Sequence, residues 1–166
     1  MTNATEGLEF KNDVGGHADQ FLTFSVAGEE YAVDILKVKE IKGYVPTTRI
    51  PNSPSEVVGV LNLRGTIVPI VDVRAKFNLE PAEYNAFTVI VIMEVAGRVM
   101  GIIVDSVSDV MNIPEGDIQP PPDFGTKSAA TSIKGMGKVG EKLIILLDID
   151  ALLLGESAAL AAQMAA

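Results

Sequence analysis

The same pattern of apolar residues and glycines occurs twice along this chain. Val26-Ala27-Gly28 is matched in the second half by Val95-Ala96-Gly97. Further on, Val68-Pro69-Ile70-Val71-Asp72 is matched by Ile144-Ile145-Leu146-Leu147-Asp148. A repeat of this length indicates that one structural unit has been duplicated, because each copy keeps a similar spacing of turns and core positions. The chain must therefore fold into two similar units.

Each copy consists of short apolar runs joined by tight turns. Phe21–Val26 and Tyr31–Val33 flank Gly28, and Gly59–Leu63 and Ile67–Val71 flank Arg64-Gly65-Thr66, so both segments are predicted to be hairpins. Apolar residues make up 48% of the chain and aromatics only 5%, which is typical of an aliphatic core. We predict a mostly β fold with about five short strands per copy, closed into small barrels that leave no free edge.

Short helices are expected in three places. Apolar residues recur at a spacing of three after the first hairpin of each copy, which favours one or two helical turns there: Ile35, Val38, Ile41 and Val104, Val107, Val110. Asp150 precedes Ala151–Leu154, where it is expected to cap a C-terminal helix.

The chain divides into a central domain and two terminal segments. Residues 1–19 show no apolar periodicity and are expected to form a flexible tail. Residues 20–154 form the expected domain, made of two intertwined subdomains at about 20–85 and 86–154, and residues 155–166 are an expected helical extension.

Charge and composition exclude several classes of function. The chain has 13 Lys and Arg against 22 Asp and Glu, and the net charge of −9 disfavours nucleic acid as a partner. No cysteine is present, which rules out disulfides and cysteine nucleophiles. Val89–Met93 and Leu143–Leu147, the longest aliphatic runs, are too short to span a bilayer, and the N-terminal segment lacks the apolar stretch of a signal peptide. We expect a cytoplasmic protein without direct membrane insertion.

No candidate for catalysis or cofactor binding stands out. His17, the only histidine, lies in the expected tail. Gly135–Gly140 satisfies G-x-G-x-x-G, but a strand-like run follows it where a nucleotide-binding helix is required, so these glycines are expected in turns. Carboxylates that could form an acid/base pair or a magnesium site are more simply explained as turn caps or solvated groups: Asp34, Glu40, Asp72, Asp105, Asp109 and Asp148. We predict no catalytic residue, no cofactor and no metal site.

Arg64 is the most informative single residue, because it lies at the tip of a predicted hairpin. It is either an exposed turn arginine or a guanidinium held against a carboxylate, with Glu40 the candidate, and presented to a partner. An exposed ion pair stabilises a protein by only about 0–1 kcal/mol, so such a pair would serve recognition more than folding.

Three blocks of sequence carry a family resemblance. They are Phe24…Glu30-Tyr31…Asp34-Ile35…Val38…Glu40-Ile41, then Gly59-Val60…Asn62-Leu63-Arg64-Gly65…Ile67-Val68-Pro69-Ile70-Val71-Asp72, then Gly101…Val104-Asp105…Val107-Ser108-Asp109-Val110. From about residue 20 to residue 154, the chain resembles the CheW family of bacterial chemotaxis coupling proteins.

The resemblance implies both a fold and a function. The fold is two SH3-like five-stranded β-barrels, related by internal duplication and packed around a shared hydrophobic centre. The function is that of a non-catalytic adaptor, which couples the cytoplasmic tips of chemoreceptors (methyl-accepting chemotaxis proteins) to the regulatory domain of the histidine kinase CheA. Such an adaptor is a monomer in isolation and is recruited to membrane-associated receptor arrays. The alternatives, from other classes, are a small-ligand-binding barrel or a carboxylate-dependent hydrolase.

The resemblance also assigns contact residues. The kinase-binding surface, on the first barrel, carries over to Val38, Glu40 and Gly59. The receptor-binding groove, between the barrels, carries over to Arg64, Val89 and Val110.

Overall fold

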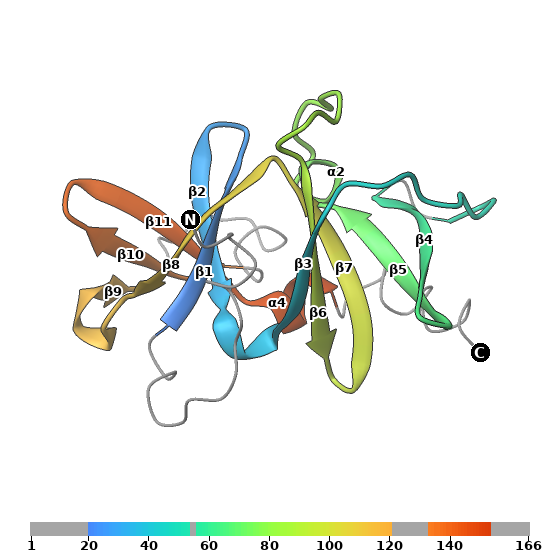
Figure 1. Ribbon diagram of the computed structural model, residues 1–166. Coiled ribbons are helices and arrows are strands. Elements are labelled where there is room, and N and C mark those ends of the chain that lie inside the picture. The colour runs from blue at the N-terminus through green and yellow to red at the C-terminus, as the bar shows by residue number, and fades with distance from the viewer. Residues whose placement is uncertain (1–19, 54–55, 121–132, 154–166) are drawn as a thin grey trace, which may run out of the picture.

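The computed structural model describes residues 20–53, 56–120 and 133–153, which form two β-sheets (Figure 1). The predicted tail at 1–19 and the predicted extension at 155–166 lie outside the described residues. In spatial order the six-stranded sheet contains β8 (Ser106–Asn112), β1 (Gln20–Val26), β2 (Glu29–Asp34), β11 (Lys142–Leu147), β10 (Ile133–Val139) and β9 (Ile118–Gln119). The five-stranded sheet contains β3 (Val38–Gly43), β6 (Val89–Val95), β7 (Arg98–Val104), β5 (Thr66–Asp72) and β4 (Val57–Leu63). The mostly β prediction is confirmed.

The duplication is visible in the strand order. Each strand of the first copy has a counterpart in the second copy: β1 and β6, β2 and β7, β3 and β8, β4 and β10, β5 and β11. Replacing every strand by its counterpart turns the order β3-β6-β7-β5-β4 into β8-β1-β2-β11-β10. The first hairpin of each copy therefore lies in the sheet that holds the remaining strands of the other copy. Each sheet draws strands from both sequence copies, and the boundaries at about 20–85 and 86–154 stay a prediction.

Both sheets are closed at their edges. β3 and β4 are the outer strands of the five-stranded sheet, and the chain beyond β3 returns so that Thr48 and Val60 exchange two backbone hydrogen bonds of 2.9 and 2.8 Å. In the six-stranded sheet β9, which follows β8 along the chain, pairs with β10 in the same way. Closure of this kind provides hydrogen-bond partners for the backbone groups of the edge strands and gives each unit the form of a small barrel.

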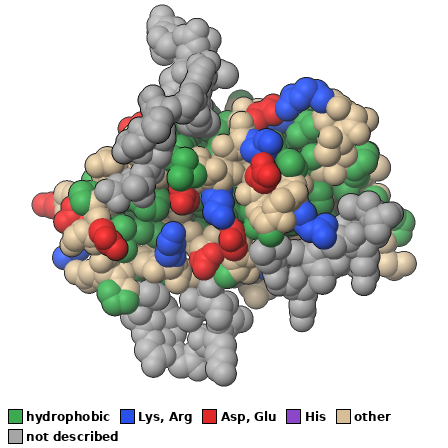
Figure 2. Space-filling model, turned by 90° about the horizontal axis from the view of Figure 1, so that it is seen from below, with side chains coloured by type: hydrophobic (Ala, Val, Ile, Leu, Met, Phe, Trp, Pro, Cys, Tyr) green, Lys and Arg blue, Asp and Glu red, His purple; other side chains and the backbone are tan. Residues whose placement is uncertain are grey.

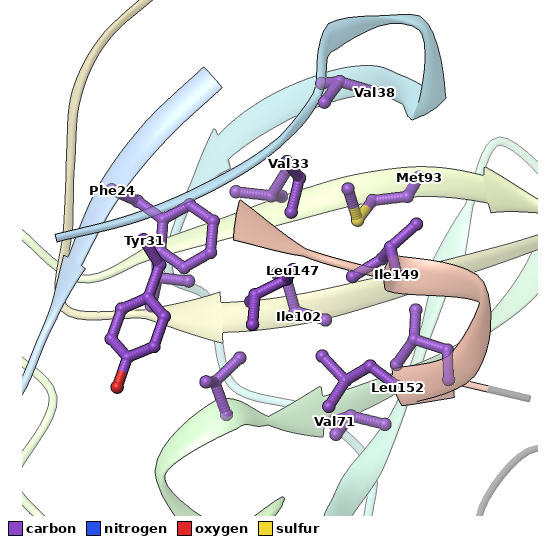
Figure 3. Packing of buried hydrophobic residues seen from close by; sticks show 14 of the residues in the cluster. Phe24, Tyr31, Val33, Val38, Val71, Met93, Ile102, Leu147, Ile149 and Leu152 are labelled. Atoms are coloured by element: carbon purple, nitrogen blue, oxygen red, sulfur yellow. The ribbon is translucent and has the colours of Figure 1, made fainter. Parts of the chain in front are cut away.

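The molecule has one large central core and a smaller core inside each sheet. Side chains alternate along β6, so that Ile90 and Ile92 face the interior of the five-stranded barrel while Val91 and Met93 face the other sheet. The central cluster contains 20 buried residues and the barrel interiors contain six and five, so the junction between the sheets holds most of the buried apolar surface. Figure 3 shows Phe24, Ile102, Leu147 and Leu152 meeting there from four different elements.

The helical turns predicted after each hairpin are mostly strands. Only a single 3-10 turn, η1 (Ile35–Lys37), is present in the first copy, and β8 follows β7 without a helix. The pairing of β3 with β6 has a bulge between Val38 and Glu40, and the pairing of β8 with β1 has one at the counterpart position. A bulge adds one residue to the strand and puts residues three apart on the same side. The apolar spacing of three therefore came from bulges, and this prediction was wrong for the second copy.

Short helices follow the last strand of each copy. They are α2 (Val73–Lys76) and α4 (Ile149–Leu153), and a 3-10 turn, η2 (Glu115–Asp117), precedes β9. Asp72 Oδ1 accepts a hydrogen bond from Arg74 N, and Asp148 Oδ1 accepts one from Ala151 N at 3.1 Å, so both aspartates, which were expected to cap turns, cap short helices. The predicted cap Asp150 was wrong, because this residue already lies in the first turn of α4.

Gly59 provides a test of barrel closure. Its φ is +154°, and a Cβ atom at this position would lie 2.6 Å from Thr47 Oγ1 and closer still to the carbonyl oxygen of Thr48. We expect Gly59→Ala to lower the free energy of unfolding by about 2–4 kcal/mol, measured by urea denaturation. Gly43→Ala is the matched control, because a Cβ there meets nothing within 4 Å. Equal stability of the two variants would contradict a tight closure at Gly59.

Candidate protein-binding surfaces

Arg64 occupies a strained position at the tip of the β4–β5 hairpin. Leu63 pairs with Thr66, which leaves Arg64 and Gly65 as a two-residue loop with φ of 51° and 89°. A type I′ turn of this kind favours Asn, Asp or Gly, and an arginine in the left-handed region costs about 1 kcal/mol. Its counterpart in the second copy is Gly140, with φ of 63°. The arginine is therefore unfavourable for the turn itself, which points to a role for its side chain.

The side chain of Arg64 is held by Glu40 on β3. Arg64 Nη2 donates to Glu40 Oε1 at 2.7 Å, and this hydrogen bond raises the pKa of the guanidinium above its ordinary value. The Arg64 side chain is 76% exposed and that of Glu40 is 29% exposed. The pair is joined through one guanidinium nitrogen. The Arg64 guanidinium is thus a positive charge held at the surface beside the Glu40 carboxylate.

The other two residues predicted to contact the kinase are buried. Val38 is 6% exposed and belongs to the central cluster, where it pairs with Met93. Gly59 is buried beneath the segment that carries Thr48. Among the three, only Glu40 has a side chain at the surface. Val38 and Gly59 shape the surface from below.

Val89 and Val110 lie at the junction of the two sheets. Val89 is at the start of β6 and Val110 is on β8, and both half-buried side chains pack against the central cluster. The structure thus brings Val89 and Val110 to the rim of the same core from different sheets. Arg64 lies beside Glu40 of β3.

Sequence reasoning missed a polar cluster around Arg74. Its guanidinium donates to both carboxylate oxygens of Asp105, at 3.0 and 2.6 Å, and to the carbonyl oxygen of Glu80 at 2.7 Å. Tyr84 donates to Asp72 Oδ2 at 2.7 Å. These side chains line a hollow of about 100 Å³. Arg74 and Asp105 are far apart in the sequence, so no local pattern could have paired them.

The cluster is built for structure rather than catalysis. Burial and the hydrogen bond to Asp72 raise the pKa of Tyr84, which keeps its phenol protonated. The hydrogen bond from Arg74 lowers the pKa of Asp105, with a further contribution from the backbone N–H of Ala27. The charged groups of the cluster thus form hydrogen bonds and ion pairs with other groups of the cluster.

The other chemical candidates have structural positions. Of the glycines expected in turns, Gly140 lies in the β10–β11 turn, whereas Gly135, beside a bulge, and Gly137 lie within β10. His17 lies outside the described residues. Within residues 20–53, 56–120 and 133–153, no group of three or more His, Asp or Glu side chains could hold a metal ion. In the same part of the chain, no helix is long and apolar enough to cross a bilayer.

The surface mixes charged and apolar side chains. In Figure 2 acidic and basic side chains lie next to one another and are not separated by sign. Ile67 and Leu143, which are counterparts in the two copies, are 54% and 53% exposed, each close to a hairpin tip. Aliphatic residues exposed singly are common on protein surfaces and do not by themselves mark an interface. The fold defines the class of protein as a module of two β-barrels built around a shared core.

Comparison with known proteins identifies the family. A family model for the CheW-like domain matches residues 20–156, and the chain belongs to this family. It is 45% identical over 146 residues to the chemotaxis protein CheW of Klebsiella aerogenes, covering 88% of each chain. It is 37% identical to CheW of Rhizobium meliloti, covering 90% of this chain and 93% of the relative.

A solved structure shares the fold. The scaffolding protein TtCheW from Thermoanaerobacter tengcongensis matches with a TM-score of 0.77 and 33% identity, over 84% of this chain and 94% of that chain. Members of the family are named as chemotaxis and scaffolding proteins and not as enzymes, in agreement with the predicted class. The chain is a scaffold protein of chemotaxis.

The lowered pKa of Asp105 predicts how stability depends on pH. The native protein binds a proton at Asp105 less readily than the unfolded chain, so this stabilisation is present above the ordinary aspartate pKa of about 4 and is lost as pH falls below it. We expect Asp105→Asn to lower the free energy of unfolding by about 1–2 kcal/mol at pH 7. The difference from the parent should shrink in urea titrations below about pH 4. Asp117→Asn, at an exposed acid outside the cluster, is the matched control for loss of one carboxylate. A pH-independent loss in Asp105→Asn would contradict the assignment.

Proposed function

We propose that this protein is a non-catalytic adaptor that couples chemoreceptor tips to the regulatory domain of the histidine kinase CheA. The observation that carries this proposal is Arg64, a strained and exposed arginine that Glu40 holds in place. A side chain kept in a position where glycine would be more favourable suits recognition, because it adds little to stability. Membership of a family of chemotaxis scaffolds supports the same conclusion.

Two separate surfaces suit two partners. In the proposal, the kinase contacts Glu40 on β3, with Val38 and Gly59 supporting that surface from below. The receptor contacts Val89 and Val110 at the junction of the sheets. Arg64, assigned to the receptor by family resemblance, lies beside Glu40 and forms the charged border between the two surfaces. β3 joins them, since Glu40 lies within this strand and Gly43 at its end pairs with Val89.

Weak individual contacts are sufficient for such an adaptor. A typical protein interface buries about 1,600 Å² in total, and a chain of this size can form two of them on different faces. In a receptor array the partners are repeated, so bridging raises the effective concentration at each contact. The adaptor is thus proposed to be monomeric in isolation and to join arrays at the membrane through its partners.

Arg64 is predicted to be important for binding and unimportant for folding. Arg64→Gly copies the second repeat and removes the backbone strain, whereas Arg64→Ala removes only the side-chain contact. We expect both variants to keep a Tm within a few degrees of the parent, and to weaken binding to at least one partner by about tenfold or more. Calorimetric titration with a receptor signalling fragment and, separately, with the kinase regulatory domain measures this effect. Unfolding of Arg64→Gly would show that Arg64 is structural.

Val110 is predicted to serve the receptor selectively. Val110→Asp should weaken receptor binding by about tenfold while affinity for the kinase regulatory domain changes less than twofold, because a charge opposes an apolar contact. Ile41→Asp is the matched control, since Ile41 is the counterpart of Val110 in the first copy and also packs against the central cluster from the half-buried rim. Equal effects of the two substitutions on receptor binding would contradict a local contact at Val110.

Reconstitution tests the proposed function as a whole. Kinase autophosphorylation is measured with receptor fragments, with and without this chain. We expect receptor-dependent activation only when the chain is present. Absence of binding to both partners, together with thermal stabilisation by a small molecule, would instead favour a ligand-binding barrel.

A further inference from the structure

The segment between α2 and β6 carries the most exposed large hydrophobic side chain in the described part of the chain. Phe87, in this segment, is 72% exposed. Aromatic residues make up only 5% of the chain, yet Tyr84 of the same segment contacts Tyr44, with ring centroids 4.4 Å apart. In Figure 1 residues 77–88 project beyond the two sheets at the top of the molecule. Most connections in compact domains have about 4–6 residues, and longer ones often serve a function.

Hydrogen bonds hold this segment in a defined conformation. Phe87 N donates to Asn85 Oδ1 at 2.8 Å, and Asn85 N donates to Thr88 Oγ1 at 2.8 Å. Tyr84 Oη donates to Asp72 Oδ2 at 2.7 Å, which ties the segment to the end of β5. A segment that is already ordered loses less conformational entropy on binding than a flexible loop does. Phe87 is therefore an exposed aromatic group on a preorganised support, as is typical of residues that dominate binding energy.

The hollow of the Arg74 cluster adjoins this segment. Its lining includes Asn85 and Thr88 from the segment and the buried Ile103 from β7. The volume of the hollow is about 100 Å³. Pockets for small molecules usually have about 300–1,000 Å³, so this hollow admits the end of one side chain and not a metabolite.

Charge decides which side chain suits the hollow. Three carboxylates and one guanidinium line it: Asp72, Glu83, Asp105 and Arg74. Arg74 is already bound to both carboxylate oxygens of Asp105. Glu83 is exposed, and in the part of the chain that the structure describes its carboxylate has no hydrogen-bond or ion-pair partner. The hollow therefore favours the positive end of a lysine or arginine over an anion.

The same charges disfavour two other occupants. The chain has a net charge of −9, so a second copy of it would bring further negative charge to this acidic surface. An anionic lipid surface is repelled for the same reason. The occupant that fits both the aromatic group and the hollow is a segment of another protein that combines apolar and basic side chains.

The hollow lies next to the surface proposed for the receptor. Val89 is the first residue of β6 and pairs with Val104, the last residue of β7. The residues directly beyond this pair are Thr88 and Asp105, and both line the hollow. A partner that contacts Val89 therefore reaches the hollow and Phe87 by extending past the end of these two strands.

We propose that Phe87 and the hollow extend the receptor-binding surface. An apolar side chain of the receptor contacts Phe87, and a neighbouring lysine or arginine of the receptor enters the hollow beside Glu83. This inference rests on the proposed adaptor function. It adds Phe87 and Glu83 to the contacts at Val89 and Val110, and it specifies a receptor segment that is both apolar and basic.

Calorimetric titration with a receptor signalling fragment tests the aromatic contact. Phe87→Ala should weaken binding by about tenfold, because it removes an exposed anchor, while its Tm stays within a few degrees of that of the parent. Leu143→Ala is the matched control, since Leu143 is 53% exposed and lies on β11 of the six-stranded sheet. The control should bind the fragment with the affinity of the parent.

Substitution of Glu83 tests the charge of the occupant. Glu83→Gln should weaken receptor binding by about threefold and Glu83→Lys by about tenfold. Between about 0.05 and 0.5 M NaCl, the affinity of Glu83→Gln should also fall less than that of the parent, because one ion pair is missing. Glu115→Gln removes the same charge from an exposed position on η2 and should keep the affinity and the salt dependence of the parent.

Failure of this inference is distinguishable from failure of the adaptor function. A parent chain that does not bind the receptor fragment would refute the adaptor function and the inference with it. A parent that binds, together with Phe87→Ala that binds equally well, would overturn the inference alone. Equal effects of Glu83→Gln and Glu115→Gln would also overturn it, because the net charge of the chain and not the hollow would then act on the receptor.

Discussion

The central hydrophobic cluster is the interaction on which the rest of the structure depends. Its 20 buried residues come from both sheets and from the short helices that end each copy. The exchange of first hairpins reinforces this dependence, because the β1–β2 hairpin completes a sheet whose other strands belong to the second copy. Neither copy contains all the strands of one barrel. The chain is therefore expected to fold as one cooperative unit, in which surfaces on different barrels keep a defined relation to each other.

The sequence predicts those features that leave a local or periodic signal. The duplication, the hairpins around Gly28 and Arg64-Gly65, and the caps Asp72 and Asp148 all follow from patterns within a few residues. A local signal also misled, since the bulge beside Val38 imitates the spacing of a helix. The exchange of hairpins between the two sheets could not be predicted from such patterns. A strand alternates apolar and polar side chains in the same way whether its neighbour in the sheet comes from the first copy or the second.

The candidate site could be predicted only in part for a related physical reason. A contact of Arg64 with Glu40 was one of two alternatives considered for an arginine at a hairpin tip, and this contact is observed. The buried position of Gly59 depends on how the segment that carries Thr48 returns to β4, which has no signature in the sequence, and Val38 is buried because β3 packs on the central cluster. Arg74 and Asp105 meet because the β7–β8 crossover passes α2, and that is a consequence of the exchanged topology.

The two copies share a scaffold but differ at the surface. Asp109 is the counterpart of Glu40, and its carboxylate accepts a hydrogen bond from Val110 N, while Gly140 stands where the first copy has Arg64. In the second copy glycine removes the strain from the hairpin turn, and the Asp109 carboxylate binds the backbone. In the first copy the turn at Arg64 stays strained, and Arg64 forms an exposed ion pair with Glu40. A symmetric fold in this way carries unlike surfaces. Because exposed contacts contribute little to stability, they can diverge without disturbing the common core, and this suits the proposed adaptor, which contacts two different proteins.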